Sequence, residues 1–192
     1  MEEKDIKIKK AKLSKSGYVE ATYTDDEGNE ITLKGIKKAH PDMRTALDAL
    51  VPYFADLTEQ KEADAIDWED MKSAYNIDLL RRLKVTGVSV GGDDSNRFVT
   101  ISGNRTLLTS RVLNLNSPGV ELDSETFEWP HIDQFAFELE GFFYEVKEYI
   151  LHHKYDTAQQ EFNFEADPAD PFGDGGEAPA PVPMDMIPED VA

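Results

Sequence analysis

The first part of the chain alternates apolar and polar residues with a period of two, which predicts β-strands. Isoleucine and lysine alternate in the first such segment, and Val19, Ala21 and Tyr23 share one face of the second. The sequences Ser-Lys-Ser-Gly and Asp-Asp-Glu-Gly-Asn, both typical of turns, separate the segments. The pattern therefore predicts an antiparallel meander of three strands at residues 6–13, 18–24 and 30–34.

A second block of alternating residues occupies 83–115. Its turns are expected at the Gly-Gly-Asp-Asp sequence of residues 91–94 and at Gly103-Asn104. These turns would separate strands at residues 85–90, 98–102 and 107–115. The sequence Ile-Thr-Leu-Lys-Gly in the first block resembles Val-Thr-Ile-Ser-Gly in the second, so a duplicated unit is one interpretation of the two blocks.

Two segments show helical spacing instead. Apolar residues recur three or four positions apart through residues 41–57, where Pro52 should kink or divide the helix. Residues 58–75 are polar and are expected to be helical only in pieces. The broadest apolar stripe lies in residues 130–154, which should therefore cover a sheet. Its members are Ile132, Phe135, Leu139, Phe142, Phe143, Val146, Tyr149 and Ile150.

These elements predict an α+β domain over residues 1–155, built from antiparallel β-meanders with two main helices packed on the sheet. Residues 156–192 differ in character, because proline, glycine, alanine and acidic residues dominate them. Such a composition buries too little apolar surface to offset the loss of chain entropy. We therefore expect a disordered acidic tail.

Charge is distributed unevenly along the chain, whose formal net charge is −19. All 20 lysines and arginines precede residue 155, whereas 10 of the 39 acidic residues follow it. This balance argues against a general affinity for duplex DNA or anionic membranes, although a local basic patch is compatible with it. The chain shows no secretion signal and no apolar run of membrane-spanning length, so a cytoplasmic protein is expected.

No residue pattern points to catalysis. The absence of cysteine excludes disulfides and thiolate metal sites. The turn at Gly91-Gly92-Asp93-Asp94 resembles the Gly-Gly-Asp-Glu-Phe hairpin of nucleotide cyclases, but Asp94-Ser95 replaces Glu-Phe. Histidines 152 and 153 are adjacent and diverge on a helix, so they do not chelate together. We expect no enzyme, no cofactor and no metal site; a metal-dependent hydrolase stays open only because carboxylates are abundant.

Basic residues of the body are the candidates for binding. Lysines along the first strand, with tyrosines and a phenylalanine nearby, suit a groove for single-stranded DNA, where cations contact phosphates and rings stack on bases. The same lysines would alternatively serve only to protect an edge strand from aggregation. The candidate residues are Lys7, Lys9, Lys12, Tyr18, Tyr23, Arg97, Phe98 and Arg105. The binding hypothesis requires Lys7, Lys9, Arg97 and Arg105 to converge on one face.

The tail, with its acidic residues among Pro and Gly from Asp167 to Asp190, resembles that of bacterial single-stranded DNA-binding proteins. This resemblance implies that the tail recruits a replication or repair protein. The chain departs from the family at its end, which is Val191-Ala192 instead of Pro-Phe. Before the tail, Gln159, Phe162 and Phe164 resemble the short peptide by which bacterial replication proteins bind the sliding clamp.

The body resembles uncharacterised proteins of prophages and mobile elements of Bacteroidetes over residues 15–24 and 85–116. That resemblance implies a setting in phage DNA metabolism and assigns no activity. We therefore expect a non-enzymatic accessory protein of phage-like DNA replication or recombination, which binds single-stranded DNA through the body and a protein partner through the tail. The alternative is an acidic interaction module or inhibitor of a host protein that never binds nucleic acid.

Overall fold

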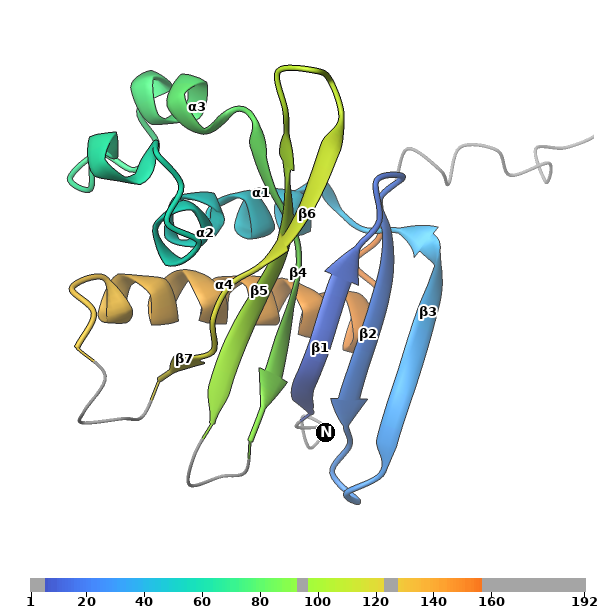
Figure 1. The fold of residues 1–192 in the computed structure, drawn as a ribbon. Helices are drawn as coiled ribbons and strands as arrows, with labels where there is room; N and C mark the ends of the chain where they lie inside the picture. Colours follow the sequence, from blue (N-terminus) through green and yellow to red (C-terminus); the bar gives the residue numbers. More distant parts are fainter. Residues whose placement is uncertain (1–5, 93–96, 123–127, 157–192) are drawn as a thin grey trace, which may run out of the picture. The chain divides into compact units, whose positions relative to one another are not determined.

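The computed structural model describes residues 6–92, 97–122 and 128–156 (Figure 1). The chain divides into a body, residues 1–160, and a C-terminal segment, residues 161–192. The predicted disorder of the tail falls almost entirely on residues outside the described ranges. The α+β class predicted for the body is confirmed, since antiparallel strands and helices build it together.

The described strands form one sheet in the order β3-β2-β1-β4-β5-β6, and every pair is antiparallel. The two predicted meanders meet through their first strands, β1 and β4. A short seventh strand continues the edge and pairs with β5. The strands are β1 (Lys7–Leu13), β2 (Tyr18–Thr24), β3 (Glu30–Lys38), β4 (Leu83–Gly91), β5 (Phe98–Thr106), β6 (Val112–Asn116) and β7 (Val120–Glu121).

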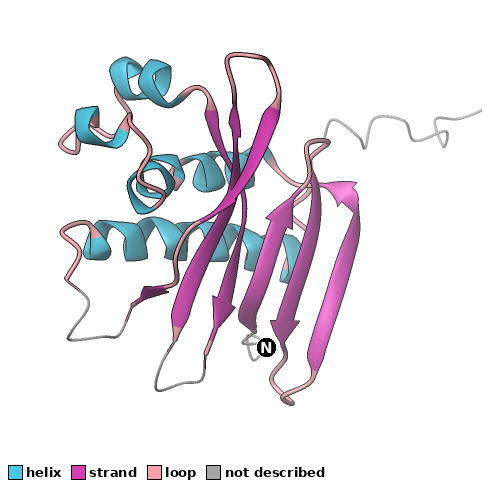
Figure 2. Ribbon diagram, viewed as in Figure 1, coloured by secondary structure: helices cyan, strands magenta, loops and turns pink. Residues whose placement is uncertain are grey.

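The helices lie on one side of this sheet (Figure 2). As predicted, Pro52 lies where one helix is replaced by two, because its missing N–H and its ring disrupt the preceding turn. The long helix α4 crosses behind the strands (Figure 1) and buries Phe135, Leu139, Phe142 and Val146 in the core. The helices are α1 (Pro41–Asp48), α2 (Val51–Leu57), the 3₁₀ turn η1 (Ala63–Ala65), α3 (Ala74–Leu80) and α4 (Ile132–Leu151).

The turn predicted at Gly103-Asn104 is wrong, because both residues lie inside β5. A Cβ atom on Gly103 would lie 2.7 Å from the Phe54 ring, so this glycine permits close packing of α2 on the sheet. The chain turns later, where the backbone N–H of Leu107 donates to the carbonyl of Arg111. The third strand is consequently shorter than predicted.

Two further elements were not predicted. Helix α3 is capped by Ser73, whose side chain accepts a hydrogen bond from the backbone N–H of Asn76. Strand β7 follows a bulge at Ser117, where the Ser117 Oγ accepts from the Ile101 N–H at 2.9 Å. The side chain thus replaces a backbone acceptor, and β6 and β7 form one interrupted edge beside β5.

Candidate nucleic-acid interface

In the described residues, no helix covers the second face of the sheet (Figure 2). Strand alternation explains its composition: Ala11 and Leu13 of β1 face the core, whereas Lys10 and Lys12 point the other way. We call this surface the open face. Two rows of side chains in register define it: Lys34, Glu20, Lys12, Ser102 and Asn116, then Thr32, Thr22, Lys10, Ser89 and Thr100.

The open face is polar, and its side chains can form hydrogen bonds with both donors and acceptors of a ligand. Hydroxyl and amide groups on it both donate and accept hydrogen bonds, and Thr22 and Thr32 already share one at 3.2 Å between their Oγ1 atoms. Two shallow hollows flank Lys12: one of about 420 Å³ towards the β1–β2 turn, and one of about 350 Å³ over β4 and β5. An extended polymer bound across the strands would contact both of these hollows.

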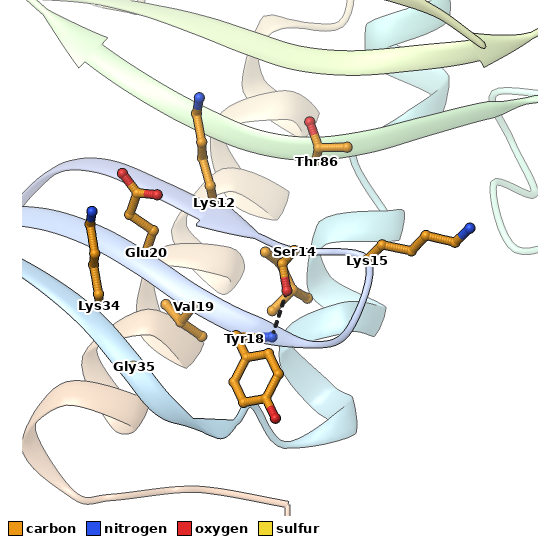
Figure 3. A pocket seen from close by; sticks show the side chains of 10 residues that line it. Lys12, Ser14, Lys15, Tyr18, Val19, Glu20, Lys34, Gly35 and Thr86 are labelled. Atoms are coloured by element: carbon orange, nitrogen blue, oxygen red, sulfur yellow. Dashed lines mark hydrogen bonds between the residues drawn. The ribbon is translucent and has the colours of Figure 1, made fainter.

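Lys12 occupies the centre of this face. A Cβ atom on Gly87 of β4 would lie 2.6 Å from Lys12 Cγ, so the missing side chain leaves room for the lysine stem. Figure 3 shows Lys12, Glu20 and Lys34 projecting side by side from β1, β2 and β3, while the Tyr18 ring extends away from them. The face therefore presents two lysines with a carboxylate between them.

An aromatic ring lies near the opposite end of the open face. The Phe98 ring covers two glycines, since Cβ atoms on Gly91 and Gly119 would lie 2.5 Å and 3.1 Å from it. Phe98 remains 40% exposed, so part of its surface is available to a stacking base.

The two layers of the body differ in charge. Among the described residues, the strands carry nine lysines or arginines and three acidic residues. The helices of the same ranges carry two basic and ten acidic residues. Among the regular elements the strands are therefore basic and the helices acidic, while further acidic residues lie in the segments that connect them.

Three of the candidate residues from the sequence gather elsewhere, at the start of β1. Lys7, Lys9 and Arg97 line a groove of about 700 Å³ together with Phe143 and Tyr144 of α4. Lys9 also contacts Glu30 at 2.6 Å, an exposed ion pair that contributes little to stability. These three cations lie together, but Arg105 is not among them, so the convergence of all four on one face that the binding hypothesis requires is not met.

Two candidates lie on the other side of the sheet. Tyr23 alternates with Thr22 and Thr24 and packs against the core. Arg105 points into the helix layer, where its guanidinium binds Glu62 with two contacts of 2.6 and 2.7 Å. This ion pair lowers the pKa of Glu62, chiefly through the hydrogen bonds from Arg105. Neither residue is placed to contact a ligand on the open face.

Lys34 and Glu20 were not among the candidates from the sequence, whereas Lys10 belongs to the lysine-rich first strand that was proposed to bind phosphates. The signal for Lys34 was the register of two hairpins: β2–β3 sets Lys34 opposite Glu20, and β1–β2 sets Glu20 opposite Lys12. The proposed clamp-binding residues Gln159, Phe162 and Phe164 lie outside the described residues. Within the described ranges, no three histidine or acidic side chains gather closely enough to hold a metal ion.

No protein-family model, curated protein or solved structure matches the chain. None of the helices in the described part combines the length and the apolar character needed to cross a bilayer. The geometry of the body is therefore what bears on function.

Proposed function

We propose that this protein is a non-enzymatic accessory factor of phage-like DNA replication or recombination, which binds single-stranded DNA across the open face. The observation that carries the proposal is the composition of that face. It brings Lys10, Lys12 and Lys34 together with hydroxyl and amide side chains on a surface that no described helix covers. Extended nucleic acid is bound elsewhere by such combinations of cations, polar groups and exposed rings.

The direction of binding follows from the positions of the cations. From Lys10 and Lys12 the cations continue along β1 to Lys9 and Lys7, and Phe98 lies two strands away at the start of β5. A strand following this path would place phosphates near the lysines and one base on the Phe98 ring. Because the contacts are mainly to phosphates, the proposed binding is weakly dependent on sequence and strongly dependent on salt.

The second half of the proposal concerns the tail. Gln159, Phe162 and Phe164 would engage a replication or repair protein such as a sliding clamp, and the acidic tail would keep that site accessible. This part rests on the sequence resemblance alone.

The test is fluorescence anisotropy of labelled oligothymidylate with the full chain, at low and high salt. We expect micromolar binding that weakens as salt rises, with a slope of roughly 0.7 for each phosphate neutralised. The double variant K10Q/K12Q should weaken binding about tenfold, whereas K61Q/K72Q, which removes two exposed lysines outside the sheet, serves as the matched control. Absence of binding at low salt, or equal losses in the two variants, would rule out the open face as the site.

A further inference from the structure

A second groove, of about 510 Å³, opens on the helix layer. It lies between Tyr53 of α2, the segment that precedes α3, and the first half of α4. Its apolar surface comes from Tyr53, Trp68, Met71 and Phe137. We call it the acidic groove, because most of its other lining residues are acidic. None of the residues proposed to bind DNA lines it.

Phe137 is the most exposed residue of its apolar surface. Its neighbours Phe135 and Leu139 point to the sheet and are fully or almost fully buried, so Phe137 projects from the opposite side of α4 and is 74% exposed. Exposed aromatic residues beside a groove are typical of surfaces that bind another protein.

The rim of this groove is negatively charged. Four carboxylates line it, and Lys72 is the one cation among its described lining residues. Elsewhere the described acids often have partners: Glu62 binds Arg105, and Lys154 bridges Asp42 and Glu145. In the described ranges, no lysine or arginine forms an ion pair with the four carboxylates of the rim, which are Glu69, Asp70, Asp133 and Glu138.

The carboxylate of Glu138 influences the Tyr53 hydroxyl, which also lines the groove. Burial raises the pKa of the Tyr53 hydroxyl to about 12, and the negative charge of Glu138 adds to that rise. The Trp68 ring forms the adjacent wall and is held by His131, whose ring stacks on it with centroids 3.5 Å apart. A ligand that enters the groove would contact the stacked Trp68 ring and the carboxylates of the rim, which outnumber the one lysine beside them.

We infer that the acidic groove docks a cationic segment of a partner protein, one that carries arginine or lysine beside an apolar side chain. The cations would bind the rim carboxylates, and the apolar side chain would pack on Phe137 and Met71. Charge complementarity selects this occupant. A second copy of the chain that approached through the same groove would bring another helix layer with ten acids and two basic residues, which repels the first. The inference does not depend on DNA binding, because it uses the other layer of the body.

The probe is a short synthetic peptide with arginines around one leucine, compared with the same peptide carrying glutamates. Binding to the full chain is measured by calorimetry, and its location by NMR shifts of backbone amides. The test variants are F137A and E138Q, and the matched controls are Y144A and E140Q. Both controls lie on α4 and outside the groove, and Tyr144 is also largely exposed.

We expect the arginine peptide to bind and to shift amides in the first half of α4. F137A should weaken it about tenfold and E138Q about threefold, while both controls change affinity less than twofold. These ratios remain informative in the presence of the acidic tail, which is identical in every variant.

Three results would overturn the inference. One is that the glutamate peptide binds as tightly as the arginine peptide. Another is that the test variants and the control variants lose the same amount of affinity for the arginine peptide. The third is sedimentation showing a dimer that F137A dissociates, since the groove would then belong to a second copy of the chain.

Discussion

The phenol oxygen of Tyr149 occupies the space that a side chain at position 35 would need. From there it donates a 2.7 Å hydrogen bond to the carbonyl oxygen of Lys37. The last turns of α4 are thereby attached to the edge strand β3, and Gly35 is required because any Cβ atom would displace the ring. This contact fixes one end of the helix layer against the sheet.

Substitution at these positions should therefore reduce stability. Y149F removes one hydrogen bond and should lower the free energy of unfolding by about 1 kcal/mol. G35A should cost more, because the tyrosine must move as well. Urea denaturation measures both. The matched control is G141A on α4, where a Cβ atom meets nothing within 4 Å and where we expect a gain of about 0.5–1 kcal/mol. If G35A left the free energy of unfolding unchanged, this packing of Tyr149 on Gly35 would be contradicted.

Glu20 should oppose DNA binding, since it places a carboxylate between Lys12 and Lys34 on the open face. E20Q removes that charge and keeps the shape of the side chain. We expect tighter binding of oligothymidylate, by about twofold to threefold at low salt and less at high salt. E59Q, which neutralises an exposed acid of the helix side, is the control for the change in net charge. Equal gains in both variants would mean that the effect is not local.

The ion pair between Glu62 and Arg105 should make stability depend on pH. Because Arg105 lowers the pKa of Glu62, the stabilisation is complete above the ordinary value of 4.5 and is lost as pH falls through the lower folded-state value. At neutral pH, E62Q should cost about 2 kcal/mol. The difference between E62Q and the unaltered chain should shrink in acid, where protonated Glu62 resembles glutamine. Urea titrations at neutral and acidic pH test this, and a constant difference would contradict it.

The end of the folded body should lie one residue beyond the boundary at 155 expected from the sequence. The backbone N–H of Asp156 donates to the carbonyl of Lys38 at 3.0 Å, and the Tyr155 ring contacts that of Tyr149 with centroids 4.9 Å apart. A chain ending at Asp156 should therefore keep its melting temperature. One ending at Lys154 should melt roughly 5 °C lower, as loss of about 2 kcal/mol implies for a domain of this size. Calorimetry distinguishes the two, and equal melting temperatures would show that Tyr155 contributes nothing.

Local patterns in the sequence were sufficient for most of the fold. Alternation and turn residues identified β1, β2 and β3, Pro52 marked the division between α1 and α2, and the apolar stripe identified α4. The errors arose where tertiary packing decides. Gly103 was interpreted as a turn, whereas its lack of a side chain accommodates the Phe54 ring within a longer strand. Nothing local reveals which ring will lie above a glycine.

The same error displaced part of the candidate site. With β5 predicted to end before Gly103, the alternation could not assign Arg105 to a face of the sheet; in the longer strand it alternates with Asn104 and faces the helices. Tyr23 was assignable from the sequence, since it shares a face with Val19 and Ala21. The acidic groove was not, because its residues are brought together from α2, α4 and an irregular segment that separates them in the chain.

The separation of charge between the two layers has a consequence for how the body meets a polyanion. Because the strands are mostly basic and the helices mostly acidic, the body carries its charge unevenly between the two layers. A nucleic acid strand would exert a torque on it before any contact forms, turning the open face inward. The helix layer would then face solvent, and its groove would remain accessible while the sheet is occupied.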